Sequence, residues 1–153
     1  MIAKRIDMRN ASKSRATRLA KYVTNELERA GRVADIFTAN CISDDALLAA
    51  KEIEICQAKN TRAKDDKTYH LLLSFPDGER PDKEQLRAMA DAAAKALGYG
   101  EHQRIAAIHD DTDNLHMRFS STRFIPNVSP SIRPVAISKF WLSCARSWSA
   151  TIL

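Results

Sequence analysis

The chain has 153 residues, of which 44% are hydrophobic and 28% are charged, a composition typical of one soluble globular domain. It contains no run of about eighteen apolar residues, which a membrane-spanning helix would need, and its first residues lack the apolar core of a signal peptide. The three cysteines are widely spaced and form no CxxC motif, so we expect reduced thiols. These features predict a cytoplasmic protein without a membrane span.

The net charge of +5 is unevenly distributed. Residues 114–153 contain five Lys or Arg and no Asp or Glu, so the whole positive excess lies there. The same segment holds eight of the twelve serines, both tryptophans and no glycine, which is an abrupt change of composition. Residues 1–32 carry nine Lys or Arg against three acidic residues. This excess is typical either of a phosphate-binding surface or of a solvated helix face.

Taken in chain order, the predicted elements begin with a short strand over residues 1–6. Ser12 or Ser14 then caps an amphipathic helix that ends near Arg29, with apolar side chains at three- and four-residue spacing. The following segment, 33–42, is rich in β-branched and aromatic residues and predicts a second strand.

A second helix is predicted to start at Ser43 as its N-cap and to run to about Ala58, with Asp45 in its first turn. The next apolar segment, TYHLLLSF at 68–75, is continuous and bounded by polar loops. This pattern is typical of a central strand that is buried on both faces.

A third helix is predicted to begin at Pro81 or Asp82 and to end at Gly98 or Gly100. It is followed by a predicted strand over 102–108 and by another that begins over 115–119. The last two strands are joined by the short polar loop 110–114, so they must be antiparallel neighbours. This arrangement favours an α+β fold with a mostly antiparallel sheet over a doubly wound parallel sheet.

The clearest chemical signal is HDDTDNLHM, residues 109–117, in which two histidines flank the predicted hairpin. Because His109 ends one strand and His116 begins the next, both imidazoles can face one side of the sheet and bind a divalent metal ion. Asp111 is suited to accept a hydrogen bond from a ring N–H and so fix its tautomer. The alternative is a polar turn with two incidental histidines, since a firm metal site needs three or more ligands.

Other side chains are candidates for phosphodiester chemistry. Tyr22 lies on the basic helix, where its phenol can attack a phosphate that a metal ion polarises, or where it can simply be a core tyrosine. Ser74 ends the buried strand and can bind a backbone phosphate or a neighbouring carbonyl. Lys21 and Arg18, on the same helix as Tyr22, are candidate contacts to DNA phosphates.

Three segments together resemble the motifs of conjugative relaxases, the mobilisation nucleases of the HUH superfamily. HDDTDNLHM resembles the third motif, KTYHLLLSF the second, and MIAKRI with the helix segment LxKYxT the first. The resemblance covers Met1 to about Met117 and is nearest to the relaxases of IncP-type plasmids. It implies an HUH-type α+β fold, with helices packed on the faces of the sheet. It also implies site- and strand-specific nicking of DNA at an origin of transfer.

The same resemblance implies a role for each candidate residue. Tyr22 would attack the scissile phosphate and remain linked to the 5′ end, and Ser74 would contact the DNA nearby. His109 and His116 would be two of three ligands of Mg²⁺ or Mn²⁺, and Asp111 would support His109. The implied partners are single-stranded DNA at the origin and the accessory proteins of the relaxosome.

Arg118 departs from the family pattern, because it stands where the family has its third histidine. A protonated guanidinium has no lone pair for a metal ion. We therefore expect impaired nicking by this chain. The alternatives are a non-catalytic remnant that binds single-stranded or origin DNA, and a rolling-circle replication initiator of the same superfamily.

The departure coincides with the change of composition, and we hypothesise the loss of a nucleotide near codon 118. SSTRFIP, residues 120–126, can be coded so that the shifted frame reads INKIHP, which resembles the family sequence just after the third motif. The same shift over 136–152 permits an amphipathic helix. The hypothesis predicts a relaxase core over 1–117 and an out-of-frame tail over 118–153 that ends at an early stop, packs poorly and promotes aggregation. A nucleotide sequence in which no other frame continues the relaxase pattern would refute it.

Overall fold

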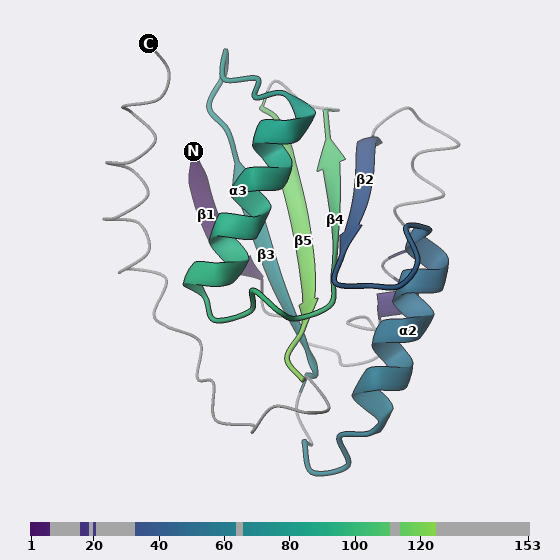
Figure 1. Cartoon of the computed structure of the whole chain (residues 1–153). Helices are drawn as coiled ribbons and strands as arrows, with labels where there is room; N and C mark the ends of the chain where they lie inside the picture. Colours follow the sequence, from purple (N-terminus) through teal and green to yellow (C-terminus); the bar gives the residue numbers. More distant parts are fainter. Residues whose placement is uncertain (7–15, 19, 21–32, 64–65, 111–113, 125–153) are drawn as a thin grey trace.

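The computed structural model describes residues 1–6, 16–18, 20, 33–63, 66–110 and 114–124. Within these ranges, a single five-stranded sheet is accompanied by two defined helices (Figure 1). The elements are β1 (Ile2–Ile6), β2 (Val33–Ala39), α2 (Ala46–Ala58), β3 (Thr68–Ser74), α3 (Lys83–Ala96), β4 (Arg104–His109) and β5 (His116–Thr122). No helix in the described ranges has the length and apolarity needed to cross a membrane.

The strand order across the sheet is β1-β3-β5-β4-β2, and every neighbouring pair is antiparallel. β4 and β5 form the predicted hairpin, with His109 opposite His116. β3 and β5 are not consecutive in the sequence but pair along their whole length, from Thr68 opposite Thr122 to Ser74 opposite His116. The predicted α+β fold with a mostly antiparallel sheet is therefore confirmed.

One face of the sheet is covered by α3, which lies in front of β3 and β5 in Figure 1. Successive residues of a strand point to opposite faces, so alternate residues of β3, β4 and β5 point toward α3. With the apolar side of the helix they form the main core, which includes Leu71, Leu73, Leu86, Ala90, Ala93, Ile108, Met117 and Phe119. Each large side chain buried here contributes about 1.5–3 kcal/mol to stability.

The opposite face of the sheet carries a smaller apolar cluster against α2. Ile105 of β4 packs there with Ala50 and Ile53 of α2, and Ala16 and Ala20 join them from the N-terminal segment. Residues 16–18 and 20 are helical, as predicted. Two helical segments thus lie on the face of the sheet that α3 does not cover.

α2 begins later than predicted, because Asp45 and not Ser43 is its N-cap. The Asp45 carboxylate accepts hydrogen bonds from the backbone N–H groups of Leu47 and Leu48 at 2.9 and 2.8 Å. The backbone N–H of Ser43 instead donates to the Glu52 carboxylate at 3.0 Å, which holds residue 43 in the preceding turn.

β2 ends at Ala39, earlier than the predicted Ile42. Asn40 has a φ of 57°, a left-handed conformation that breaks the strand and that asparagine tolerates better than most residues. Its side-chain amide donates to the carbonyls of Gly100 at 2.7 Å and His102 at 3.1 Å. These hydrogen bonds tie the end of β2 to the segment that leads into β4.

α3 begins at one of the two predicted positions. The Asp82 side chain accepts a hydrogen bond from the Gln85 backbone at 2.8 Å, and the Gln85 side chain accepts one from the Asp82 backbone at 3.0 Å. Gly98 follows the helix with a φ of 81°, the left-handed conformation that commonly ends helices.

Candidate active site

Three of the predicted site residues lie side by side in one row across the sheet. Ser74 of β3 is opposite His116 of β5, and His116 is opposite His109 of β4. Residues directly opposite each other in an antiparallel sheet point to the same face. That face is the one away from α3, because the neighbouring residues Met117 and Ile108 point into the core beneath α3. We call Ser74, His116 and His109 the histidine row.

The histidine row is partly shielded from solvent. His109 is only 7% exposed, and Ser74 and His116 are half-buried. Nε2 of His109 and Nδ1 of His116 are both buried, and Nδ1 of His116 has no hydrogen-bond partner among the described residues. A buried polar atom in this state costs free energy unless another group binds it.

The two imidazoles fit two positions in the coordination shell of a divalent metal ion. Opposed residues in an antiparallel pair have Cα atoms about 4.5–5.5 Å apart, so both rings can reach one ion. The described part of the chain contains no group of three His, Cys, Asp or Glu that could hold a metal. Within this part of the chain, His109 and His116 are therefore not joined by a further residue of these types.

Arg118 stands where the resemblance to relaxases predicts a third metal ligand. It lies two residues beyond His116 on β5, hence on the same face of the sheet, and its side chain is exposed. It is opposite Leu72 of β3 and Ala107 of β4. Its guanidinium has no lone pair to donate to a metal ion.

The loop that follows His109 is anchored at its start by an ion pair. Arg80, in the turn after β3, donates to both carboxylate oxygens of Asp110 at 2.9 and 2.8 Å. Both hydrogen bonds come from the same nitrogen, Nη1, and they are strengthened because donor and acceptor are charged. The sequence indicated the segment after residue 75 only as a polar loop, because nothing local shows that Arg80 meets the hairpin loop.

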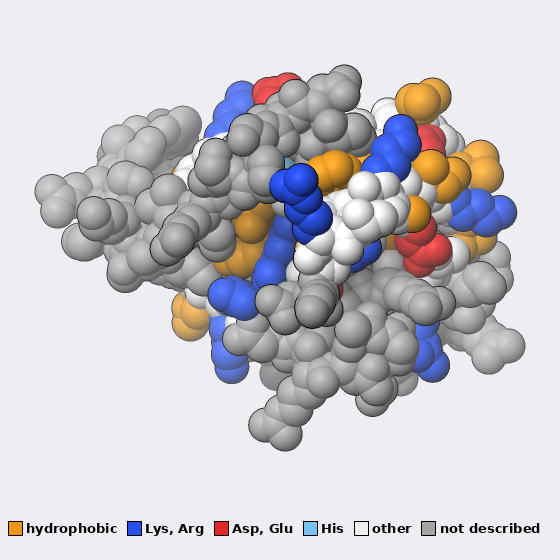
Figure 2. Space-filling view, turned by 90° about the horizontal axis from the view of Figure 1, so that it is seen from below, with side chains coloured by type: hydrophobic (Ala, Val, Ile, Leu, Met, Phe, Trp, Pro, Cys, Tyr) orange, Lys and Arg blue, Asp and Glu red, His pale blue; other side chains and the backbone are white. Residues whose placement is uncertain are grey.

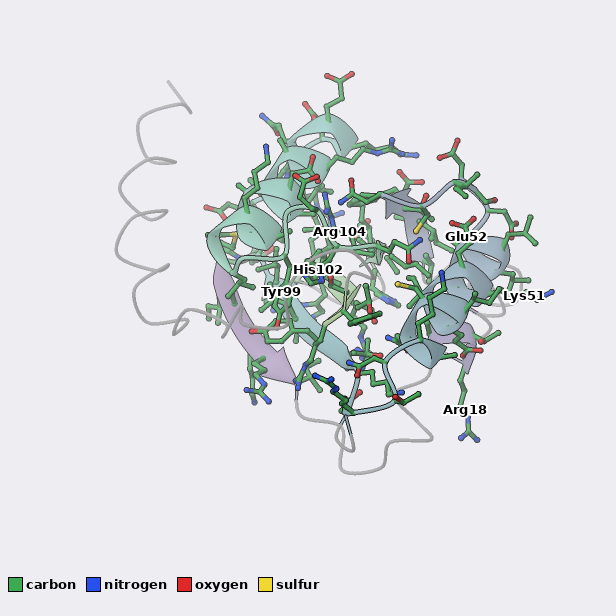
Figure 3. All side chains as sticks on the ribbon, turned by 60° about the horizontal axis from the view of Figure 1, so that its bottom comes forward. Arg18, Lys51, Glu52, Tyr99, His102 and Arg104 are labelled. Atoms are coloured by element: carbon green, nitrogen blue, oxygen red, sulfur yellow. The ribbon has the colours of Figure 1, made fainter. Side chains whose placement is uncertain are left out.

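The other predicted site residues are not part of the histidine row. Tyr22, Lys21 and Asp111 lie outside the described residues. Arg18 is described, and its exposed side chain points into solvent below α2 (Figure 3).

The two remaining histidines, His70 and His102, have structural surroundings. His102 donates from Nδ1 to the carbonyl of Thr122 at 2.8 Å, and its ring meets Tyr99 edge to face at 4.9 Å. Figure 3 shows His102 beside Tyr99 at the end of α3. Burial lowers the pKa of His102, and burial also lowers the pKa of His70. Both imidazoles therefore favour the neutral form.

Basic side chains also gather at the other end of the sheet. Figure 2 views the molecule from that end and shows Lys and Arg side chains among hydrophobic ones. Arg5 and Arg123 each lie over the ring of Tyr69, with 5.8 Å between guanidinium carbon and ring centroid. Arg5 is opposite Leu71, and both Leu71 and Tyr69 point to the face that α3 covers, so these contacts lie on the other face of the sheet from the histidine row.

Comparison with known proteins connects this arrangement to a family. A family model described as relaxase, MobA/VirD2-like, nuclease domain matches residues 22–134. Protein TraI from Escherichia coli is 43% identical over 126 residues, which are 82% of this chain and 17% of the relative. A second Escherichia coli Protein TraI is 44% identical with the same coverage. Protein MobA from Acidithiobacillus ferrooxidans is 38% identical over 61 residues, 40% of this chain and 15% of the relative.

The chain therefore spans about a sixth of the length of these relatives, 15–17% of each. The region that the family model matches contains all three residues of the histidine row and also continues past Arg118. Since the match covers most of the chain, the chain belongs to the MobA/VirD2-like relaxase family, in its nuclease domain.

Proposed function

We propose that the chain is the nuclease part of a conjugative relaxase that nicks one DNA strand at a plasmid's origin of transfer. Membership of the relaxase family supports DNA nicking in plasmid transfer. The observation that carries the proposal is the strand register that brings Ser74, His116 and His109 onto one face of the sheet. In this proposal the protein acts in the cytoplasm. Its partners are single-stranded DNA at the origin and the accessory proteins of the relaxosome.

The proposed reaction is a transesterification at the scissile phosphate. The phenolate oxygen of Tyr22 attacks phosphorus in line, a 5′-phosphotyrosine bond forms, and the bond to the 3′ oxygen breaks. The departing 3′ oxygen takes up a proton, which balances the proton that the phenol loses. The product is a protein linked to the 5′ end of the cut strand and a free 3′-hydroxyl.

The other predicted residues bind and orient in this proposal. His109 and His116 would hold Mg²⁺ or Mn²⁺, which when bound stabilises negative charge on the scissile phosphate. Asp111 would accept a hydrogen bond from the ring of His109 and fix its tautomer. The hydroxyl of Ser74 would donate to a DNA phosphate beside the histidines. Lys21 and Arg18 would contact the DNA backbone.

We further propose that nicking by this chain is impaired. The two histidines of the row would be two of the ligands, and the described residues contain no group of three His, Cys, Asp or Glu. Arg118 stands where the resemblance to relaxases predicts the third histidine. The change of composition after residue 113 supports an out-of-frame tail, with 1–117 as the relaxase core and 118–153 as the replaced segment.

The test of the nucleophile is a denaturing gel that detects a covalent adduct between the chain and a single-stranded origin oligonucleotide in Mn²⁺. We expect a slowly formed adduct that is absent in Tyr22→Phe, because phenylalanine lacks the attacking oxygen. DNA binding by Tyr22→Phe should stay nearly unchanged. An adduct that persists in this variant would contradict the role of Tyr22.

The second candidate function is a non-catalytic remnant that binds origin DNA, and the two-ligand site favours it. This function predicts that the chain binds origin DNA but forms no covalent adduct, even after long incubation in Mn²⁺. A rolling-circle replication initiator would have similar chemistry, but the MobA/VirD2-like family model favours a role in transfer.

A further inference from the structure

A second row of residues lies next to the histidine row on the same face of the sheet. Lys4 of β1 is opposite Leu72 of β3, Leu72 is opposite Arg118 of β5, and Arg118 is opposite Ala107 of β4. We call Lys4, Leu72 and Arg118 the basic row. Because it lies two residues along each strand from the histidine row, the two rows are about 7 Å apart.

The basic row presents two positive charges around an apolar centre. Lys4 and Arg118 are exposed, and Leu72 between them is half-buried. Within the described residues, neither Lys4 nor Arg118 forms an ion pair with a carboxylate. Two strand spacings separate the backbones of Lys4 and Arg118 by about 10 Å, and both side chains are long enough to reach one strand of nucleic acid.

The chemistry of the basic row suits a phosphate backbone. A guanidinium can donate two parallel hydrogen bonds to one phosphate, and an ammonium attracts phosphate as a point charge. Neither interaction requires a metal ion. The exposed part of Leu72 offers an apolar contact to a sugar or base between two phosphates.

We propose that Arg118 and Lys4 form a metal-independent binding site for the backbone phosphates of single-stranded DNA. This inference rests on the proposed function only in taking DNA as the ligand. Arg118 stands where the resemblance predicts a third metal ligand. In this proposal its guanidinium instead contacts a DNA phosphate directly. The chain therefore holds DNA beside the histidine row even when no divalent ion is present.

The experiment measures fluorescence anisotropy of a labelled single-stranded origin oligonucleotide, with the whole chain, in EDTA and over a series of salt concentrations. We expect the wild-type Kd in EDTA to stay within about threefold of its value in Mn²⁺. Arg118→Ala should weaken binding in EDTA about tenfold, as expected for loss of a charged hydrogen bond. The slope of log Kd against log salt concentration should fall by about 0.7 for each phosphate that a variant no longer binds.

Matched variants separate the proposed contacts from general charge. Lys4→Ala should act in the same direction as Arg118→Ala, and Arg118→Lys should restore part of the affinity because it keeps the charge. Lys51→Ala is the control, since Lys51 points into solvent from α2 (Figure 3) and its loss should leave Kd within about twofold of the wild-type value. Unchanged thermal melts would show that these exposed substitutions leave the fold intact.

Several outcomes would overturn the inference. They are loss of wild-type binding in EDTA, equal effects of the Arg118 and Lys51 substitutions, and displacement of DNA by inorganic phosphate at matched ionic strength. The last would indicate a site for free phosphate and not for a strand. Because the readout is binding without metal, it is independent of adduct formation. A chain that binds through Arg118 but forms no adduct would refute catalysis alone.

Discussion

Two buried histidines outside the histidine row link the stability of the protein to pH. Burial lowers the pKa of His70 and of His102 in the folded state. The unfolded chain has ordinary histidine pKa values of about 6.5, so below that pH it binds more protons than the folded chain does. The stabilisation is complete above about pH 6.5 and is lost as the pH falls toward the lowered pKa values.

We predict that the Tm falls between about pH 7.5 and pH 5.5 and that His102→Gln makes this fall shallower. Glutamine keeps a donor for the carbonyl of Thr122, which His102 contacts at 2.8 Å, but it does not titrate. Differential scanning calorimetry of both proteins over this range gives the slopes. A wild-type Tm that rises on acidification, or an unchanged slope in the variant, would contradict the prediction.

The residues of the site differ in how far the sequence could predict them. The shared face of His109 and His116 followed from their positions at the two ends of a hairpin. The pairing of Ser74 with His116 did not, because it depends on β3 and β5 meeting across 41 intervening residues, from 75 to 115. The position of Lys4 opposite Leu72 was not predictable for the same reason, since nothing near Lys4 in sequence specifies that β1 pairs with β3.

At the scale of the elements, the capping box of α3 is a local source of stability. Asp82 and Gln85 satisfy each other's backbone N–H groups at 2.8 and 3.0 Å. We predict that Asp82→Ala lowers the free energy of unfolding by about 1 kcal/mol. Urea denaturation followed by circular dichroism measures this change.

Asp77→Ala is the control for this prediction. Asp77 is an exposed residue of the neighbouring turn, and its loss should change stability by less than about 0.5 kcal/mol. Equal destabilisation by the two substitutions would show that general charge near the helix N-terminus, and not the cap, is responsible.

Element ends were predictable to within one or two residues where the sequence offers cap residues. For α3 the sequence left Pro81 or Asp82 open as the start and Gly98 or Gly100 as the end, and the structure selects Asp82 and Gly98. The start of α2 was misplaced, because Ser43 and Asp45 are both good N-caps, and Ser43 is held outside the helix by several contacts, including the one with Glu52. That contact depends on the turn before the helix, which local propensity does not specify.

At the scale of the whole molecule, the strand order assembles the site from distant parts of the chain. β1 comes from the N-terminus, β3 from the middle and the β4–β5 hairpin from beyond residue 103, yet they are neighbours in one sheet. The histidine row crosses β3, β5 and β4, and the basic row crosses β1, β3 and β5. A change in the register of β3 or β5 would separate the side chains of both rows.

The predicted start of the out-of-frame tail at residue 118 falls inside β5. Phe119 is 1% exposed in the core beneath α3, and Ser121 and Thr122 are fully buried. A short strand requires little beyond side chains that fit the surface of the sheet. The end of β5 can therefore form whether its residues come from the original reading frame or from a shifted one. The described residues end at 124, and the origin of the tail remains a prediction that the nucleotide sequence tests.

The central claim is that the histidine row is a relaxase centre interrupted by Arg118 and by a shifted reading frame. The most direct test compares covalent adduct formation in Mn²⁺ by the wild-type chain, Arg118→His and a chain with the reading frame restored. We predict that the frame-restored chain reacts more than about 100-fold faster than the wild type, since even groups that support metal ligands are worth about 10–100-fold. Arg118→His alone should recover little. Equal rates for the wild-type and frame-restored chains would contradict the claim, and full recovery by Arg118→His would contradict the shifted reading frame.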